Sequence, residues 1–189
     1  FRSQKEVDRQ NAINTGTAHI NNWLGAFFTP DFYAQRAQDY TNFAQPQLDA
    51  EHEKARRSLV YALADRGLTR STAAAVPLGE LERQYGTQQQ KIADQARQYA
   101  DEARGNVETT RQNLIQTLNQ NADAGQAYSG AQQQIPVLAA VPAFNPLGQV
   151  FTDIAGTIGT ARNAANAAAF NNNATRLFSS NGGSGQVVR

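Results

Sequence analysis

The sequence contains no cysteine, which excludes disulfide bonds, thiol nucleophiles and thiolate metal sites such as zinc fingers. Methionine is absent too, and the chain begins at Phe1, which indicates a processed product or a missing natural start. Charge of one sign is also lacking, because 17 basic and 16 acidic residues leave a net charge of +1. The chain as a whole therefore has no bulk attraction for nucleic acid or anionic lipid, and any such binding must be local.

Long apolar runs are missing as well. We find no stretch of about 18 apolar residues and no signal-peptide pattern, so we expect neither a transmembrane helix nor a secretory leader. Hydrophobic residues make up 40% of the chain and aromatic residues 8%, and the mean hydropathy is −0.57. Asn and Gln together supply roughly a fifth of the residues. This composition predicts thin helical contacts and little independent core.

The N-terminal segment, residues 1–30, carries an aromatic cluster. We expect a polar helix over residues 1–14, followed by an irregular connection with the sequence NTGTAHINN. The densest apolar cluster of the chain comes next and consists of Trp23, Leu24, Phe27 and Phe28. Large aromatic residues anchor interfaces as readily as cores, so these side chains either are buried within the chain or insert into a partner.

Residues 31–76 are predicted to form a helical, hairpin-like region. The sequence Thr29-Pro30-Asp31 is typical of a helix start, and a first helix is expected over 31–44, where Pro46 interrupts it. A second helix is expected to end at Gly67, a favourable residue just past a helix end. Ser71 can cap the Ala-rich turn that follows, and Pro77 begins the next helix. Gly67, Ser71 and Pro77 therefore define a predicted hinge.

Residues 77–125 show the clearest periodicity in the chain. Apolar and small residues recur at steps of 3 and 4 in an eleven-residue rhythm with a mean near 3.67, which predicts one long, straight or slightly right-handed helix of about 57 Å. Because the stripe is narrow, and Gln88 and Thr110 lie within it, we expect it to pack against neighbouring copies of the chain. The predicted assembly seam comprises Leu81, Tyr85, Ile92, Ala96, Tyr99, Ala103, Val107, Leu114 and Leu118.

Glycine and proline residues determine the predicted structure of the C-terminal third of the chain. Residues 126–147 contain three prolines within eleven positions, which predicts an extended apolar strap rather than a helix. A C-terminal helix is expected over 148–178 and a flexible Gly-rich tail over 179–189. Further candidate partner anchors lie in the strap: Pro136, Val137, Leu138 and Phe144.

The inventory of catalytic side chains is short. His19 and His52 are the only imidazoles, and His52 lacks the second histidine four residues on that a zinc-binding helix needs. The sequence therefore predicts neither an enzyme nor a metal or other cofactor.

The stretch ALADRGLTRSTAAA, residues 62–75, resembles a helix-turn-helix at first reading. Arg66 stands where an apolar residue should hold the two helices together, however, and Pro77 leaves too little room for a recognition helix. Basic side chains in this region can still contact phosphates without reading sequence. The candidate phosphate contacts are Arg56, Arg57, Arg66 and Arg70.

The run YTNFAQPQLDAEHEKARRSLVYALADRGLTRSTAAA, residues 40–75, resembles a segment of small structural proteins of short-tailed bacteriophages, and the Gly/Ser-rich ending SSNGGSGQVVR is similar to their tails. Asp65 stands where a basic residue is common in that family. The matching positions are Pro46, Leu48, Leu59, Tyr61, Ala62, Leu63, Ala64, Arg66, Gly67, Leu68, Ser71 and Thr72. The resemblance implies a multi-copy virion component at the portal or tail, or inside the capsid, that is associated with genome ejection.

We therefore expect an all-α, extended subunit that forms a ring or sheath in a phage particle and contacts portal or tail proteins. A near-neutral surface rich in Gln suits a conduit along which genomic DNA slides with only non-specific contact. One alternative is an ejected internal protein that engages the host envelope through a helix over 147–170. A second alternative is a DNA-binding regulator built on residues 59–76.

Overall fold

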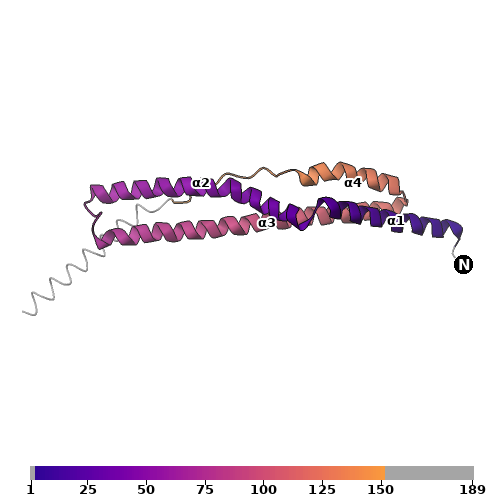
Figure 1. Ribbon diagram of the computed structural model, residues 1–189, viewed down its shortest axis with the longest axis horizontal. Helices are drawn as coiled ribbons and strands as arrows, with labels where there is room; N and C mark the ends of the chain where they lie inside the picture. Colours follow the sequence, from indigo (N-terminus) through magenta and orange to yellow (C-terminus); the bar gives the residue numbers. More distant parts are fainter. Residues whose placement is uncertain (1–2, 152–189) are drawn as a thin grey trace, which may run out of the picture. The chain divides into compact units, whose positions relative to one another are not determined.

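The computed structural model describes residues 3–151. These residues form four α-helices, one short 3₁₀ helix and no strand, so the expected all-α class is confirmed for this part of the chain. The helices are α1 (Gln4–Phe27), α2 (Pro30–Asp65), α3 (Ala75–Asn121) and α4 (Ala124–Ala139), with the 3₁₀ helix η1 (Thr72–Ala74) before α3 (Figure 1). Residues 140–151 have no regular secondary structure.

The described residues divide into two compact units, to each of which α2 and α3 contribute. Unit 1 contains residues 3–46 and 89–146, and unit 2 contains residues 47–88 and 147–151. Each unit has its own cluster of buried hydrophobic side chains.

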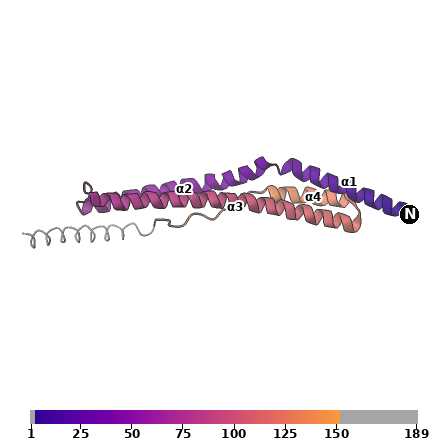
Figure 2. The ribbon, with the colours of Figure 1, turned by 90° about the horizontal axis from the view of Figure 1, so that it is seen from below.

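Unit 1 is built around α1, α4 and the parts of α2 and α3 that belong to it. Figures 1 and 2 show α4 running beside α1 and beside the C-terminal part of α3. Small residues permit this close packing: a Cβ on Gly16 would lie 2.6 Å from Cδ2 of Leu118, and one on Gly130 would lie 3.1 Å from Cδ2 of Leu114. The buried members of its cluster are Ile20, Leu24, Phe28, Tyr33, Val107, Leu118 and Ala127.

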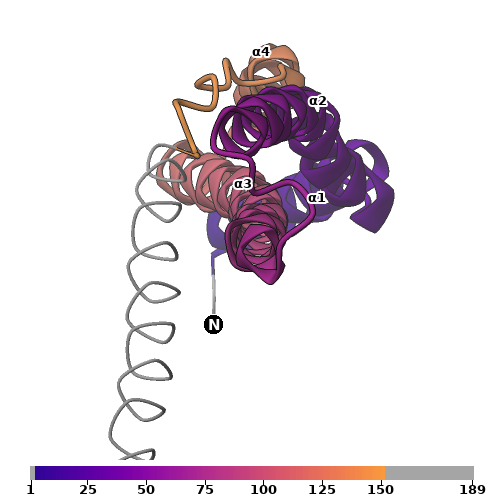
Figure 3. The ribbon, with the colours of Figure 1, turned by 90° about the vertical axis from the view of Figure 1, so that its left-hand side faces the viewer.

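Unit 2 is a helical hairpin in which the C-terminal part of α2 pairs with the N-terminal part of α3 (Figure 2), and Figure 3 shows the connection between them end on. Its buried cluster consists of Leu59, Leu63, Ala74 and Leu81. The end of α2 is a Schellman motif: the N–H of Gly67 donates to the carbonyl of Ala64, and the N–H of Leu68 donates to that of Leu63, each at 2.9 Å. Gly67 has a φ of +67°, so the expected helix stop is confirmed.

Two expected helix breaks in the N-terminal half are wrong. The stretch NTGTAHINN lies inside α1, because Gly16 and Ile20 are buried on the inner face and Gly16 permits the close approach of Leu118. Pro46 lies inside α2, so residues 31–44 are not a separate helix. An internal proline costs about 3 kcal/mol, but Ala44 and Leu48 on either side of it are completely buried and stabilise the continuous helix. The hairpin therefore joins α2 to α3 rather than lying within residues 31–76.

The expected strap over 126–147 is also corrected. Most of it belongs to α4, which is capped by Asp123, whose carboxylate accepts hydrogen bonds from the N–H groups of Gly125 and Gln126 at 2.9 and 3.1 Å. Pro136 falls in the last turn of α4, and only residues 140–147 are extended or irregular. Buried Ala127 and Ala131 show why a sequence of small residues remains helical here, since they fit the narrow space against α1.

The boundaries of the long helix differ slightly from expectation. α3 begins at Ala75, with Pro77 in its first turn, and ends at Asn121 rather than at residue 125 because Ala122 takes a left-handed conformation with φ of 51°. Residues 152–178 of the expected C-terminal helix and the expected tail over 179–189 lie outside the described residues, and residues 148–151 are not helical.

Candidate functional site

The residues of the predicted assembly seam lie on α3 and face the interior of the chain. We call them the core stripe, which comprises Leu81, Tyr85, Ile92, Ala96, Tyr99, Ala103, Val107, Leu114 and Leu118. Every one of its predicted members is buried or half-buried. Leu81 packs in the cluster of unit 2, whereas Val107 and Leu118 pack in that of unit 1. The ring centroid of Tyr99 lies 4.9 Å from that of Tyr40 and 5.0 Å from that of Phe144. The periodicity thus identified residues that pack within the chain, where they contribute to the clusters of both units. Packing of this stripe against neighbouring copies stays a prediction.

The N-terminal anchor residues divide between core and surface. Leu24 and Phe28 are buried in unit 1, whereas Phe27 is about half exposed. Trp23 is half-buried, with its ring centroid 5.1 Å from that of Tyr128 on α4. The intramolecular alternative therefore accounts for Leu24, Phe28 and much of Trp23, and only Phe27 keeps a large surface for a partner.

An exposed apolar surface spans the last turn of α4 and the residues that follow it. Residues 136–143, which we call the apolar segment, read PVLAAVPA and carry no polar side chain. All of them except Leu138 are exposed, and Val137 and Val141 are 68% and 59% exposed. Contiguous exposed apolar residues of this kind are typical of interaction surfaces. Of the predicted strap anchors, Pro136 and Val137 belong to this surface, whereas Leu138 packs on the core and Phe144 contacts Tyr40, Phe43 and Tyr99.

The predicted hinge is a well-formed connection. Gly67 terminates α2, and Ser71 occupies the cap position of η1. The Ser71 hydroxyl does not accept a capping hydrogen bond; it donates to the carbonyl of Leu68 at 3.2 Å instead. Pro77 is completely buried in the first turn of α3. These contacts fix the connection rather than loosen it.

The candidate phosphate contacts all lie on the surface of unit 2. Arg56 and Arg57 are exposed on α2, and Arg66 and Arg70 are exposed in the connection that follows. Arg56 and Arg57 line a shallow surface hollow together with Glu53, Val60 and Tyr61. Tyr61, one of the positions that match the phage proteins, is 69% exposed.

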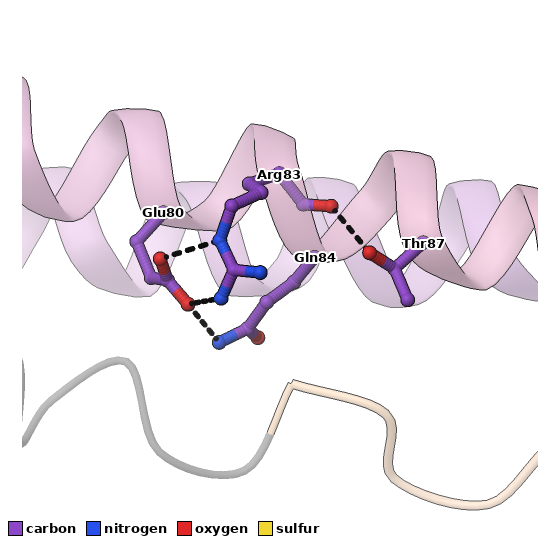
Figure 4. A network of polar contacts seen from close by, with 4 residues as sticks. All are labelled: Glu80, Arg83, Gln84 and Thr87. Carbon is purple, nitrogen blue, oxygen red and sulfur yellow. Dashed lines mark hydrogen bonds and ion pairs between the residues drawn. The ribbon is translucent and has the colours of Figure 1, made fainter.

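The carboxylates of α3 serve as partners for arginines along the same helix. Glu80 pairs with Arg83, as Figure 4 shows, with Gln84 donating to the same carboxylate and the Thr87 hydroxyl donating to the Arg83 carbonyl. These hydrogen bonds, that of Arg83 first, lower the pKa of Glu80 from 4.5 to about 2. The same spacing of three recurs in the pairs Asp94–Arg97, Asp101–Arg104 and Glu108–Arg111. Exposed ion pairs between residues three apart stabilise a helix modestly. This structural role accounts for the acidic residues of these pairs.

His52 lies in a polar and aromatic cluster of unit 2. Its Nε2 lies 3.1 Å from Oε1 of Glu82, and its ring lies 4.4 Å from that of Tyr85 and 6.0 Å from that of Phe151. The Tyr85 hydroxyl donates to Asp49 at 2.6 Å. Among residues 3–151, no group of three or more histidine, aspartate or glutamate side chains is arranged to hold a metal ion.

Arg36 in unit 1 is not among the predicted site residues. It is only 3% exposed, donates from Nη2 to the carbonyl of Ala139 at 3.0 Å, and lies over the ring of Phe32. Its Nη1 lies 3.9 Å from Asp39 and has no hydrogen-bond partner within the described residues. Because the Ala139 carbonyl ends α4, Arg36 fixes the position from which the apolar segment leaves that helix. No local sequence signal separates Arg36 from the exposed arginines.

Burial also raises the pKa of two tyrosines of unit 1. The pKa of Tyr33 is raised because burial disfavours the charged form, an effect that Arg104 opposes and Glu108 reinforces. The pKa of Tyr40 is raised by burial and by the neighbouring Tyr99. Both groups therefore stay neutral and act as core residues.

Comparison of the chain with models of known protein families, with curated proteins and with solved structures found no match. Within residues 3–151, no helix combines the length and the apolar character that crossing a bilayer requires.

Proposed function

We propose that this chain is a structural, non-enzymatic subunit of a bacteriophage particle. It is present in several copies at the portal, in the tail or in the tail lumen, and it takes part in retaining or releasing the genome. The assignment to a phage rests on the resemblance of residues 40–75 to virion proteins. A structural role is supported independently by the described side chains, since their polar contacts join neighbouring turns of a helix or hold the helices together.

The observation that carries the proposal is the apolar segment. Two exposed valines and five further exposed apolar residues, without one polar side chain among them, form a surface that water solvates poorly. Arg36 holds the end of α4 from which this segment departs, so the surface is presented in a defined position within unit 1. Since the core stripe is already buried within the chain, the apolar segment replaces it as the surface for contact with other copies or with portal and tail proteins.

The proposal is tested on particles purified from the phage that encodes the chain. Mass spectrometry should find the chain in several copies per particle, and cryo-electron microscopy should place it at the portal or tail. Substituting Val137→Ser with Val141→Ser should reduce its incorporation, whereas Val7→Ser with Val76→Ser, which alters two exposed valines elsewhere, should not. Particles that lack the chain altogether would contradict the proposal.

A further inference from the structure

Positive charge is concentrated in one short part of unit 2. Residues 54–70, which we call the basic segment, contain five basic residues and one acidic residue, Asp65. The remainder of the chain holds 12 basic and 15 acidic residues. A chain that is nearly neutral as a whole therefore carries a distinctly cationic surface. The basic residues are Lys54, Arg56, Arg57, Arg66 and Arg70.

These cations are largely unpaired. All five are exposed, and within residues 3–151 only Arg57 has a carboxylate partner, Glu53 at 3.3 Å. The arginines of α3 differ, because Arg83, Arg97, Arg104 and Arg111 each pair with a carboxylate three residues earlier. Lys54, Arg56, Arg66 and Arg70 are therefore available to an external anion without loss of a carboxylate partner, whereas the arginines of α3 are neutralised by their own helix.

Helical spacing gathers part of this charge on one ridge. Lys54, Arg57 and Tyr61 follow one another at intervals of three and four residues, so they share the exposed side of α2 over a rise of about 10 Å. Tyr61 is 69% exposed and adds a hydroxyl donor and an aromatic ring to this surface. Arginine, lysine and tyrosine are side chains that donate to phosphate oxygens.

We infer that the basic segment binds the phosphate backbone of duplex DNA without reading its sequence. It contains no Asn or Gln, which recognise adenine edges. An anionic membrane is a poorer match, because Val60 and Tyr61 are the only large apolar side chains exposed on this part of α2 and an interfacial helix buries a whole apolar face. The inference goes beyond the proposed structural role, since it concerns an activity of the isolated chain.

The test is fluorescence anisotropy of two labelled duplexes of unrelated sequence with the full chain at a series of salt concentrations. Five phosphate contacts predict a slope of log K against log salt of about −4.5, and so a loss of about 500-fold in affinity between 50 and 200 mM salt. The variant Lys54→Gln/Arg56→Gln/Arg57→Gln should reduce the slope to about −1.8. Tyr61→Phe should weaken binding by about 2- to 10-fold through loss of one hydrogen bond.

The matched control is Lys5→Gln/Lys91→Gln/Arg97→Gln, which removes the same charge from exposed positions of unit 1 and should leave the slope unchanged. Both triple variants alter exposed side chains, and circular dichroism verifies that they stay folded. Absence of duplex binding at 50 mM salt, or an equal loss in the control, would overturn the inference. Binding to phosphatidylcholine vesicles containing phosphatidylserine, without binding to DNA, would also overturn it and would assign the basic segment to a membrane.

Discussion

Units 1 and 2 reach a packed interior by different means. Unit 1 brings helices together through small residues, with Gly16 against Leu118 and Gly130 against Leu114, and fills the remaining space with aromatic rings. Unit 2 uses Leu59, Leu63 and Leu81 beside a connection that follows the end of α2 at Gly67. Unit 1 thus depends on close helix contact, whereas unit 2 depends on leucine burial and on one backbone conformation.

The surfaces of the two units differ as well. Unit 1 exposes the uncharged apolar segment, and unit 2 exposes the basic segment. Apolar surfaces are suited to protein partners, and unpaired cations are suited to polyanions. A chain with a net charge of +1 can therefore carry two distinct kinds of interaction surface, which the overall composition conceals.

The largest expected effects come from the two cores. Leu118→Ala in unit 1 and Leu81→Ala in unit 2 each remove a completely buried side chain and should lower the free energy of unfolding by about 2–5 kcal/mol. Urea denaturation followed by circular dichroism measures the loss, and hydrogen exchange should show the greatest acceleration in the unit that was changed. Val141→Ala is the exposed control and should stay within about 0.5 kcal/mol of the wild type. A loss as small as that of the control would show that the stripe is not a core.

Replacing two glycines of unit 2 by alanine should have smaller effects on stability, and these effects should be of opposite sign. Gly67→Ala places a Cβ at a φ of +67° and should destabilise the protein by about 1–2 kcal/mol. Gly86→Ala lies within α3, where a Cβ meets no atom within 4 Å, and should stabilise it by about 0.5–1 kcal/mol. Thermal unfolding of both variants distinguishes them. Equal shifts of the melting temperature in the same direction would argue against the Schellman motif at residue 67.

The smallest expected effect concerns the surface pairs of α3. Because hydrogen bonds lower the pKa of Glu80 from 4.5 to about 2, its stabilising contribution is present above pH 4.5 and is lost as the pH falls toward 2. Glu80→Gln should remove this part of the acid dependence while leaving the helix content at neutral pH unchanged. Carbon-13 NMR titration of the Glu80 carboxyl group checks the lowered pKa directly, and a midpoint near 4.5 would show that the pair is not formed in solution.

The sequence revealed the side chains that need burial more reliably than it revealed what buries them. The rhythm from Leu81 to Leu118 identified the inner face of α3, and Gly67 identified the end of α2, because both signals are local. Pro46 and Pro136 were misread as breaks, since their local cost is offset by burial of Ala44, Leu48 and Ala131, which only the tertiary structure reveals.

The candidate surfaces show the same limit. The apolar character of Pro136 and Val137 was evident in the sequence. A run of apolar residues has the same sequence pattern, however, whether it is buried or exposed. Arg36 could not be distinguished from exposed arginines, because its burial arises from the end of α4, a hundred residues away.

Sedimentation velocity tests the central claim most directly, namely that the apolar segment rather than the core stripe is the surface through which copies associate. Over a series of concentrations, the wild-type chain should form a reversible oligomer. The variant Val137→Ser/Val141→Ser should sediment as a monomer with unchanged helix content, and Val7→Ser/Val76→Ser should behave as the wild type. A wild-type chain that remains a monomer at every concentration, or an oligomer that persists when both valines of the apolar segment are replaced, would contradict the account.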